Sequence, residues 1–213
     1  KLSGIFLIKD KANKTTCWIL IKRTKKTNPI NRLLLPKSVG VGAFLAWLKE
    51  EKRNYVVPRF YEKLPELHRE GGDLDLLVAD EHADKVVDHI RSFSDQVTET
   101  LVESVPIGMH SISMTSGVPY FPPQLALTVI DNAIDGPAGS RIPTAIDDFH
   151  MFIYHALYHS KGYSTGIPSK NPGKPENPPE NDYGGIIQKK AKKLGIKIGK
   201  TMEDMDEYMS LVG

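Results

Sequence analysis

Two aspartates separated by one residue, Asp73 and Asp75, open an apolar run in the middle of the chain. In an extended segment, residues i and i+2 project to the same side, so the two carboxylates point together while Leu74 turns toward a core. Like charges this close repel each other unless a cation lies between them. Mg²⁺ and Mn²⁺ take oxygen ligands and bridge carboxylates to substrate phosphates. The pattern predicts a catalytic site in which Asp73 and Asp75 hold one divalent metal ion against a nucleotide diphosphate.

Residues close to this motif are suited to binding the phosphates of a substrate. Gly71 and Gly72 precede the aspartates and, without side chains, let a phosphate approach the backbone closely. Arg59 follows a short apolar run, and a guanidinium can contact a phosphate through two parallel hydrogen bonds. We therefore expect Gly72 and Arg59 to bind substrate. The alternative is an exposed turn with solvated side chains, although two acids in a strand-like segment oppose its propensity, as functional residues tend to do.

A second group of candidate residues lies on a later segment with helical periodicity. His155 and His159 are four residues apart and share one helical face, a spacing that can present two imidazoles to one metal ion. We expect His159 to be a third metal ligand, and His155 and Lys161 to bind substrate. No glutamate follows His155 in the metalloprotease manner. The alternative is a half-buried face with hydrogen-bonded histidines.

The composition excludes several classes of protein. The chain has 213 residues, of which 40% are apolar and 25% are charged, as in ordinary globular proteins. No apolar run is long enough to span a membrane, and the first residues lack the apolar region of a signal peptide. The single cysteine, Cys17, excludes an internal disulfide and suits a reducing compartment, so we expect a cytoplasmic protein. Because the first residue is not methionine, we expect the chain to be part of a longer protein.

The charge distribution gives no reason to expect a nucleic-acid partner. The formal net charge is only +2. A basic run near the end of the chain lacks the aromatic residues that could stack on bases, and it indicates a solvated helix face. Its members are Lys189, Lys190, Lys192, Lys193, Lys197 and Lys200.

Apolar periodicity predicts the elements that position these residues. Apolar runs predict strands over 5–8, 17–21, 55–57, 73–79, 97–102 and 110–114. A period of 3.6 predicts helices that begin near 38, 80, 122 and 144, then a basic helix ending at Gly195 and an acidic helix from Thr201. Asp80 and Thr144 are the expected N-caps. The stretches 22–37 and 170–181 predict loops, the second of them a possible lid.

Strands that are followed by helices predict an α/β fold with a central sheet covered by helices. The hairpin expected over residues 5–21 makes this sheet mixed rather than purely parallel. The length suits a single domain over residues 1–213.

A strand-associated Asp-x-Asp motif is similar to that of the metal-dependent, GT-A-type glycosyltransferases, with Asp73 and Asp75 in the acidic motif and His159 as the late histidine. The whole chain, including the run from Tyr154 to Gly162, resembles the N-terminal domains of large chlorella-virus glycosyltransferases that are associated with capsid glycans. The resemblance implies a GT-A-like fold, a UDP-sugar donor, Mn²⁺ or Mg²⁺, and retaining transfer to a glycan or glycoprotein acceptor. If the protein is viral, it also implies that the cytoplasm is that of the host.

The segment Gly71-Gly72-Asp73-Leu74-Asp75 also resembles the nucleotidyltransferase superfamily, where Gly-Gly or Gly-Ser precedes Asp-x-Asp. That group needs a third carboxylate on a later strand. The natural place is the segment 110–114, which carries serines and no acid. This resemblance implies, as the alternative function, an enzyme that uses a nucleoside triphosphate.

Overall fold

The computed structural model describes residues 2–9, 15–21, 33–67, 72–93, 104–112, 120–160, 165–170 and 182–212. The chain divides into two compact units, residues 1–32 and residues 33–213, and each is described by itself. The single domain expected over residues 1–213 stays a prediction.

The first unit is an antiparallel hairpin of β1 (Leu2–Lys9) and β2 (Thr15–Ile21). Phe6 pairs with Trp18 at its centre. The hairpin predicted for this part of the chain is therefore confirmed.

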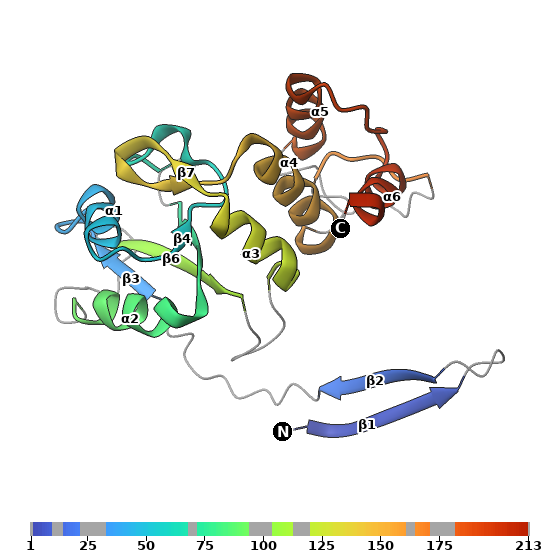
Figure 1. Cartoon of the computed structure of the whole chain (residues 1–213), viewed down its shortest axis with the longest axis horizontal. Helices are drawn as coiled ribbons and strands as arrows, with labels where there is room; N and C mark the ends of the chain where they lie inside the picture. The colour runs from blue at the N-terminus through green and yellow to red at the C-terminus, as the bar shows by residue number, and fades with distance from the viewer. Residues whose placement is uncertain are drawn as a thin grey trace. The chain divides into compact units, whose positions relative to one another are not determined.

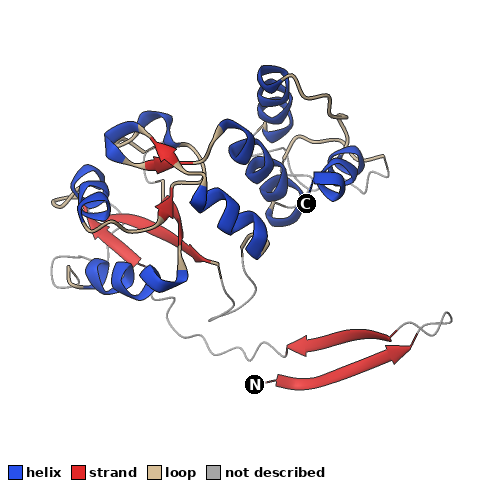
Figure 2. Ribbon diagram, in the orientation of Figure 1, coloured by secondary structure: helices blue, strands red, loops and turns tan. Residues whose placement is uncertain are grey.

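The second unit is built on a four-stranded mixed sheet with the strand order β3-β6-β5-β4 (Figures 1 and 2). The strands are β3 (Leu33–Pro36), β4 (Tyr55–Val56), β5 (Leu74–Val78) and β6 (Ser104–Ser111). β5 and β6 are parallel neighbours with a helix between them in the sequence, whereas β3 and β4 run antiparallel to the strands beside them. The predicted mixed sheet with helices is confirmed, but β3 and β4 make it mixed, because the hairpin of β1 and β2 forms a separate two-stranded sheet.

Each face of this sheet has its own hydrophobic cluster, which follows from the alternation of side chains along β5. Leu74, Leu76 and Val78 pack with α1 (Val41–Glu50) and α2 (Asp80–Arg91). Leu77 packs on the opposite face with α3 (Pro123–Asp131) and with Met151 of α4 (Ala145–Tyr154). Asp75 shares the face of Leu77 because the period of a strand is two. The strand thus presents this carboxylate toward α3 and α4.

A third cluster joins α4 to α5 (Tyr183–Leu194) and α6 (Met202–Val212), and Figure 1 shows these three helices next to one another. After Tyr154 the chain continues as a π-helical turn, η4 (His155–His159). Gly195 ends α5 in the left-handed conformation with φ 70°, which confirms the helix end predicted there. The shorter elements are η1 (Tyr61–Lys63), β7 (Ile134–Asp135), η3 (Pro137–Gly139) and β8 (Arg141–Ile142).

The structure corrects three predictions about local structure. β3 lies in the stretch 22–37 that was predicted as a loop, and its Pro36 is tolerated because it ends a strand at the edge of the sheet. β6 overlaps the strand predicted over 110–114 only at its last two residues, because the proline and the glycine in its middle resemble loop residues. The N-cap of α2 is Ala79, whereas the Asp80 carboxylate accepts a hydrogen bond from the backbone of Ile112 at 2.8 Å.

The other predicted helices are confirmed, including the one capped by Thr144, whose hydroxyl accepts a hydrogen bond from the backbone N–H of Asp147. The strand predicted over 97–102 lies outside the described residues, and so does the lid predicted over 170–181 apart from Lys170. No helix in the described part of the chain is both long and apolar enough to cross a membrane.

An ion pair between Lys190 and Asp148 holds α5 against α4. The Asp148 side chain is 5% exposed and that of Lys190 is 20% exposed. The ammonium also lies 4.5 Å from the centre of the Phe152 ring, so it contacts both the carboxylate and an aromatic face. This pair helps to position Tyr183, the first residue of α5, beside α4.

We expect Lys190→Met to lower the free energy of unfolding by about 2–3 kcal/mol in urea denaturation, because it leaves a buried carboxylate without its cation. The loss of unfolding free energy should be smaller than for a fully buried ion pair, because Lys190 is partly exposed. Lys189→Met, on the exposed side of the same helix, should change the stability by less than about 0.5 kcal/mol. Equal stabilities of the two variants would show that the ion pair contributes nothing.

Candidate functional site

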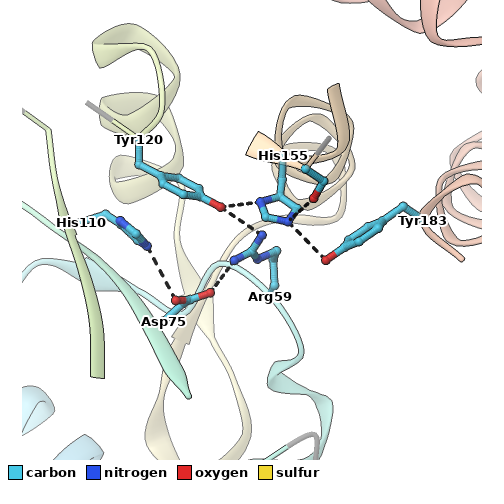
Figure 3. Close-up of polar contacts among 7 residues, drawn as sticks. Arg59, Asp75, His110, Tyr120, His155 and Tyr183 are labelled. Carbon is cyan, nitrogen blue, oxygen red and sulfur yellow. Dashed lines mark hydrogen bonds and ion pairs between the residues drawn. The ribbon is translucent and has the colours of Figure 1, made fainter. Parts of the chain in front are cut away.

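Asp75 is the centre of a polar cluster on the face of the sheet that α3 and α4 cover (Figure 3). Its Oδ2 atom accepts a hydrogen bond from Nη2 of Arg59, and its Oδ1 atom lies 3.7 Å from Nε2 of His110 on β6. Gly108 is the register partner of Asp75, and a Cβ atom at this position would collide with Oδ1. The glycine in the middle of β6 is therefore what allows the carboxylate to lie across the neighbouring strand.

Arg59 reaches this carboxylate because its segment leaves the sheet just after β4. The backbone N–H of Val57 bonds to the carbonyl of Arg141 at 2.8 Å, and Pro58 follows. Phe60 then adopts a left-handed conformation with φ 56°, and its ring meets that of Phe152 edge to face. The anchored segment turns the Arg59 side chain inward, where only 8% of it is exposed.

The Arg59–Asp75 pair is charged at neutral pH. Burial by itself raises the pKa of the Asp75 carboxyl, but the contacts with His110 and Arg59 outweigh it and lower that pKa from 3.8 to about 2. Burial likewise lowers the pKa of the Arg59 guanidinium, and the charge of Asp75 outweighs it and raises that pKa. Each group thus holds the other in its ionised form.

A chain of hydrogen bonds continues from Arg59 to α5. Nη1 of Arg59 donates to the hydroxyl oxygen of Tyr120 at 3.3 Å, and this hydroxyl in turn contacts Nδ1 of His155. Because arginine can only donate, the single hydrogen of the tyrosine hydroxyl is available to the imidazole, and we assign it to the bond with Nδ1. The proton of His155 is then on Nε2, which lies 3.2 Å from the hydroxyl of Tyr183 and 3.1 Å from Oγ of Ser160.

The π-helical turn η4 places both of its histidines against Tyr120. The backbone N–H of Ser160 bonds to the carbonyl of His155 at 2.9 Å, the i to i+5 pattern that defines such turns. The ring of His159 stacks on that of Tyr120 with 3.8 Å between the centres, and its Nε2 atom contacts the Tyr120 carbonyl oxygen. This nitrogen donates its proton to the carbonyl, which occupies one of the two ring nitrogens through which a histidine can bind a metal ion.

Both histidines of this turn are neutral at pH 7. Burial, reinforced by the charge of Arg59, lowers the pKa of His155 from 6.5 to about 3. Burial also lowers the pKa of His159. Burial raises the pKa of Tyr120, so its hydroxyl keeps the proton that it donates to His155.

The structure joins three of the predicted site residues, Arg59, Asp75 and His155, through Tyr120, and stacks His159 on that tyrosine. Asp73 is exposed, directly before β5, and the buried Gly72 precedes it. Gly71 and Lys161 lie outside the described residues.

Several residues of the cluster were not predicted from the sequence: His110, Tyr120, Ser160, Tyr183 and Gly108. Gly108 was the one with a usable signal, since a glycine between apolar residues of a strand marks a close approach of another group. The others are polar or aromatic residues whose role depends on partners that are distant in sequence.

The acidic motif offers a metal ion two carboxylates, and the described residues do not complete a set of protein ligands around them. No three side chains of His, Cys, Asp or Glu come together as a metal site among the residues that the structure describes. Both oxygens of Asp75 already face cationic or hydrogen-bonding partners. A Mg²⁺ or Mn²⁺ ion at Asp73 and Asp75 would therefore have to displace a partner of Asp75 and take its remaining ligands from substrate phosphates and water.

A comparison of the chain with models of protein families, with curated proteins and with solved structures gave no match.

The acid sensitivity of the fold should report the Arg59–Asp75 pair. Because the pKa of Asp75 is about 2 in the folded state and 3.8 as its ordinary value, the unfolded chain takes up this proton first as the pH falls. The contacts of Asp75 with His110 and Arg59 then contribute about 2 kcal/mol above pH 4, which is lost progressively toward pH 2. We expect Asp75→Asn to remove this part of the pH dependence of the unfolding free energy between pH 5 and 2. Asp84→Asn, an exposed position on α2, is the control; a wild-type slope in Asp75→Asn would refute the assignment.

His155 should affect the pH dependence of the unfolding free energy in a separate pH range. The unfolded chain binds a proton at this imidazole near pH 6.5, whereas the folded protein resists it down to about pH 3, so stability falls as the pH drops through that interval. We expect His155→Gln, whose amide can still accept and donate, to flatten the pH dependence of unfolding between pH 6.5 and 4. An NMR titration checks the cause directly: a His155 ring that titrates near pH 6.5 would contradict it.

Proposed function

We propose that this chain is a metal-dependent glycosyltransferase that moves a sugar from a UDP-sugar donor to a glycan or glycoprotein acceptor. The observation that carries the proposal is the pairing of an exposed Asp73 with an ionised Asp75 at the start of β5, where Arg59 contacts the second carboxylate. The resemblance to chlorella-virus glycosyltransferases supports a GT-A-like fold and retention of configuration as parts of the same proposal.

The proposal assigns a role to each charged group of the cluster. Asp73 and Asp75 would hold Mn²⁺ or Mg²⁺ together with the diphosphate, and Arg59 would exchange its contact with Asp75 for one with a phosphate oxygen. The bound ion would neutralise the negative charge that develops on the departing UDP. Arg59 is suited to the exchange because its Nη1 atom keeps a partner, Tyr120, on the side away from Asp75.

The neutral residues of the cluster orient Arg59 and carry no charge themselves. Tyr120 is fixed by His155 and by the stacked ring of His159, so it holds Arg59 in a defined orientation. The sugar passes through an oxocarbenium-like state in glycosyl transfer, and a site from which water is excluded limits its hydrolysis.

The sheet favours a second candidate function, nucleotidyl transfer from a nucleoside triphosphate. In that superfamily a third carboxylate stands on a later strand. Here β6 is the later strand beside β5, and the side chain that it places at Asp75 is His110. The arrangement of the two strands suits this candidate, whereas an imidazole in place of the carboxylate removes one oxygen ligand for a second metal ion.

Calorimetric binding of UDP-glucose and of ATP, each with and without Mn²⁺, tests both candidates. For a glycosyltransferase we expect UDP-glucose to bind at least about tenfold more tightly with Mn²⁺ than without it, and this gain to vanish in Asp75→Asn. Mn²⁺ alone should bind weakly, because Asp75 is already paired with Arg59. Asp84→Asn, on the exposed side of α2, should behave as the wild type.

The remaining outcomes separate the alternatives. A metal-dependent preference for ATP, with release of pyrophosphate on turnover, would favour nucleotidyl transfer. Metal-independent binding of both nucleotides, or binding of neither, would reject both functions as proposed.

A further inference from the structure

A pocket of about 580 Å³ opens between α3, α4 and α6. Its volume falls within the range of small-molecule sites, about 300–1,000 Å³. The walls include Leu125 of α3, Tyr154 of α4, Tyr158 of η4 and Met209 of α6. None of the residues that line it, all of them in the described part of the chain, is a lysine or an arginine, and none belongs to the Asp75 cluster.

A buried carboxylate, that of Asp147, also lines this pocket. Asp147 is only 4% exposed, and its Oδ2 atom accepts hydrogen bonds from the Thr144 hydroxyl at 2.6 Å and from the Asn132 amide at 3.4 Å. Its Oδ1 atom accepts no hydrogen bond, and no cationic side chain pairs with it, among the residues described. Both donors to Oδ2 are neutral, so the negative charge has no counter-ion.

The N-terminal end of α4 offsets only part of the negative charge of this carboxylate. A ligand that brings a positive charge to Oδ1 would offset the rest. A phosphate or another anion would instead be repelled, since no lysine or arginine of the pocket could neutralise it. The free oxygen therefore selects a cation.

The aromatic rings of the pocket suit the same kind of ligand. The rings of Tyr154 and Tyr158 lie 4.7 Å apart between centres, and the face of such a ring attracts a cation. His150 lines the same pocket, and its Nε2 atom lies 3.1 Å from the hydroxyl of Tyr208. Burial lowers the pKa of His150, so at pH 7 this ring adds no positive charge that would repel the ligand.

We propose that this pocket binds a small organic cation, an amine on an apolar or aromatic body, with its ammonium group at Oδ1 of Asp147 and its body against Tyr154 and Met209. The site is separate from the Asp75 cluster. Tyr154 contacts the ring of His159, which stacks on Tyr120, and Tyr120 in turn contacts Arg59. The rings of His159 and Tyr120 thus separate the pocket from the Arg59–Asp75 pair. The proposal does not rest on the proposed transferase activity.

A matched pair of ligands tests the proposal on the intact chain. 2-Phenylethylamine and 2-phenylethanol share their apolar body and differ in charge, and calorimetry at pH 7 and low salt compares them. We expect the amine to bind wild type at least about tenfold more tightly than the alcohol. Asp147→Asn, which keeps the shape of the side chain, should abolish this difference while the affinity for the alcohol stays within about twofold.

Two controls fix the position of the amine. Asp131→Asn changes an exposed carboxylate at the end of α3 and should leave the preference for the amine intact. Asp75→Asn should leave it intact as well, and a loss there would move the amine to the other site and overturn the proposal. Equal affinities of wild type for the amine and the alcohol would also overturn it, and this comparison needs no folded variant.

Discussion

The ion pair between Arg59 and Asp75 is the contact on which the site depends. Only 8% of the arginine side chain and 17% of the aspartate side chain are exposed. Removing two charges from water costs several kcal/mol for each ion, and their attraction compensates only where the geometry is good and the other polar atoms have partners. The strands meet these conditions for Asp75, because β6 contributes a glycine where the carboxylate crosses it and His110 faces the second oxygen. For Arg59 they are met only in part, since its buried Nε atom has no hydrogen-bond partner among the described residues.

The pair also sets the protonation of its surroundings. The positive charge of Arg59 acts together with burial to keep His155 neutral, and a neutral imidazole can accept from Tyr120 on one side and donate toward Tyr183 on the other. Hydrogen bonds thereby run from the sheet through η4 to α5. Buried polar networks of this kind stabilise a single arrangement when every member has a partner, and they become costly when one is removed. Alternatives in which α4 or α5 shifts would break several of these contacts together.

In the proposed function, the same pair would make the acidic motif bind a metal ion together with substrate phosphates rather than alone. Asp75 is ionised without a metal ion, but Arg59 is paired with one of its oxygens. A metal ion that binds together with phosphates would therefore bind more tightly than a free metal ion. The phosphates offer the displaced guanidinium a new anionic partner, which a bare ion does not. Glycosyl transfer and nucleotidyl transfer would both need a metal ion bound together with phosphates. The two functions differ at the position of His110, where nucleotidyl transfer would need a carboxylate. The pocket beside Asp147 has the opposite character, since its carboxylate lacks a cation altogether.

The sequence by itself determined the elements whose residues carry a local signal. Helical periodicity gave α1 to α6 and the alternation around Asp75 gave β5, because amphipathic patterns depend only on neighbours along the chain. The sequence also identified Arg59, Asp75 and His155 as candidate site residues from the chemistry of their side chains alone. Only the tertiary structure decided that they form one network and that Tyr120 connects them, since those contacts span many residues. β6 was hidden for the same reason: a glycine in a strand looks unfavourable locally, and its purpose appears only when a carboxylate of the next strand lies across it.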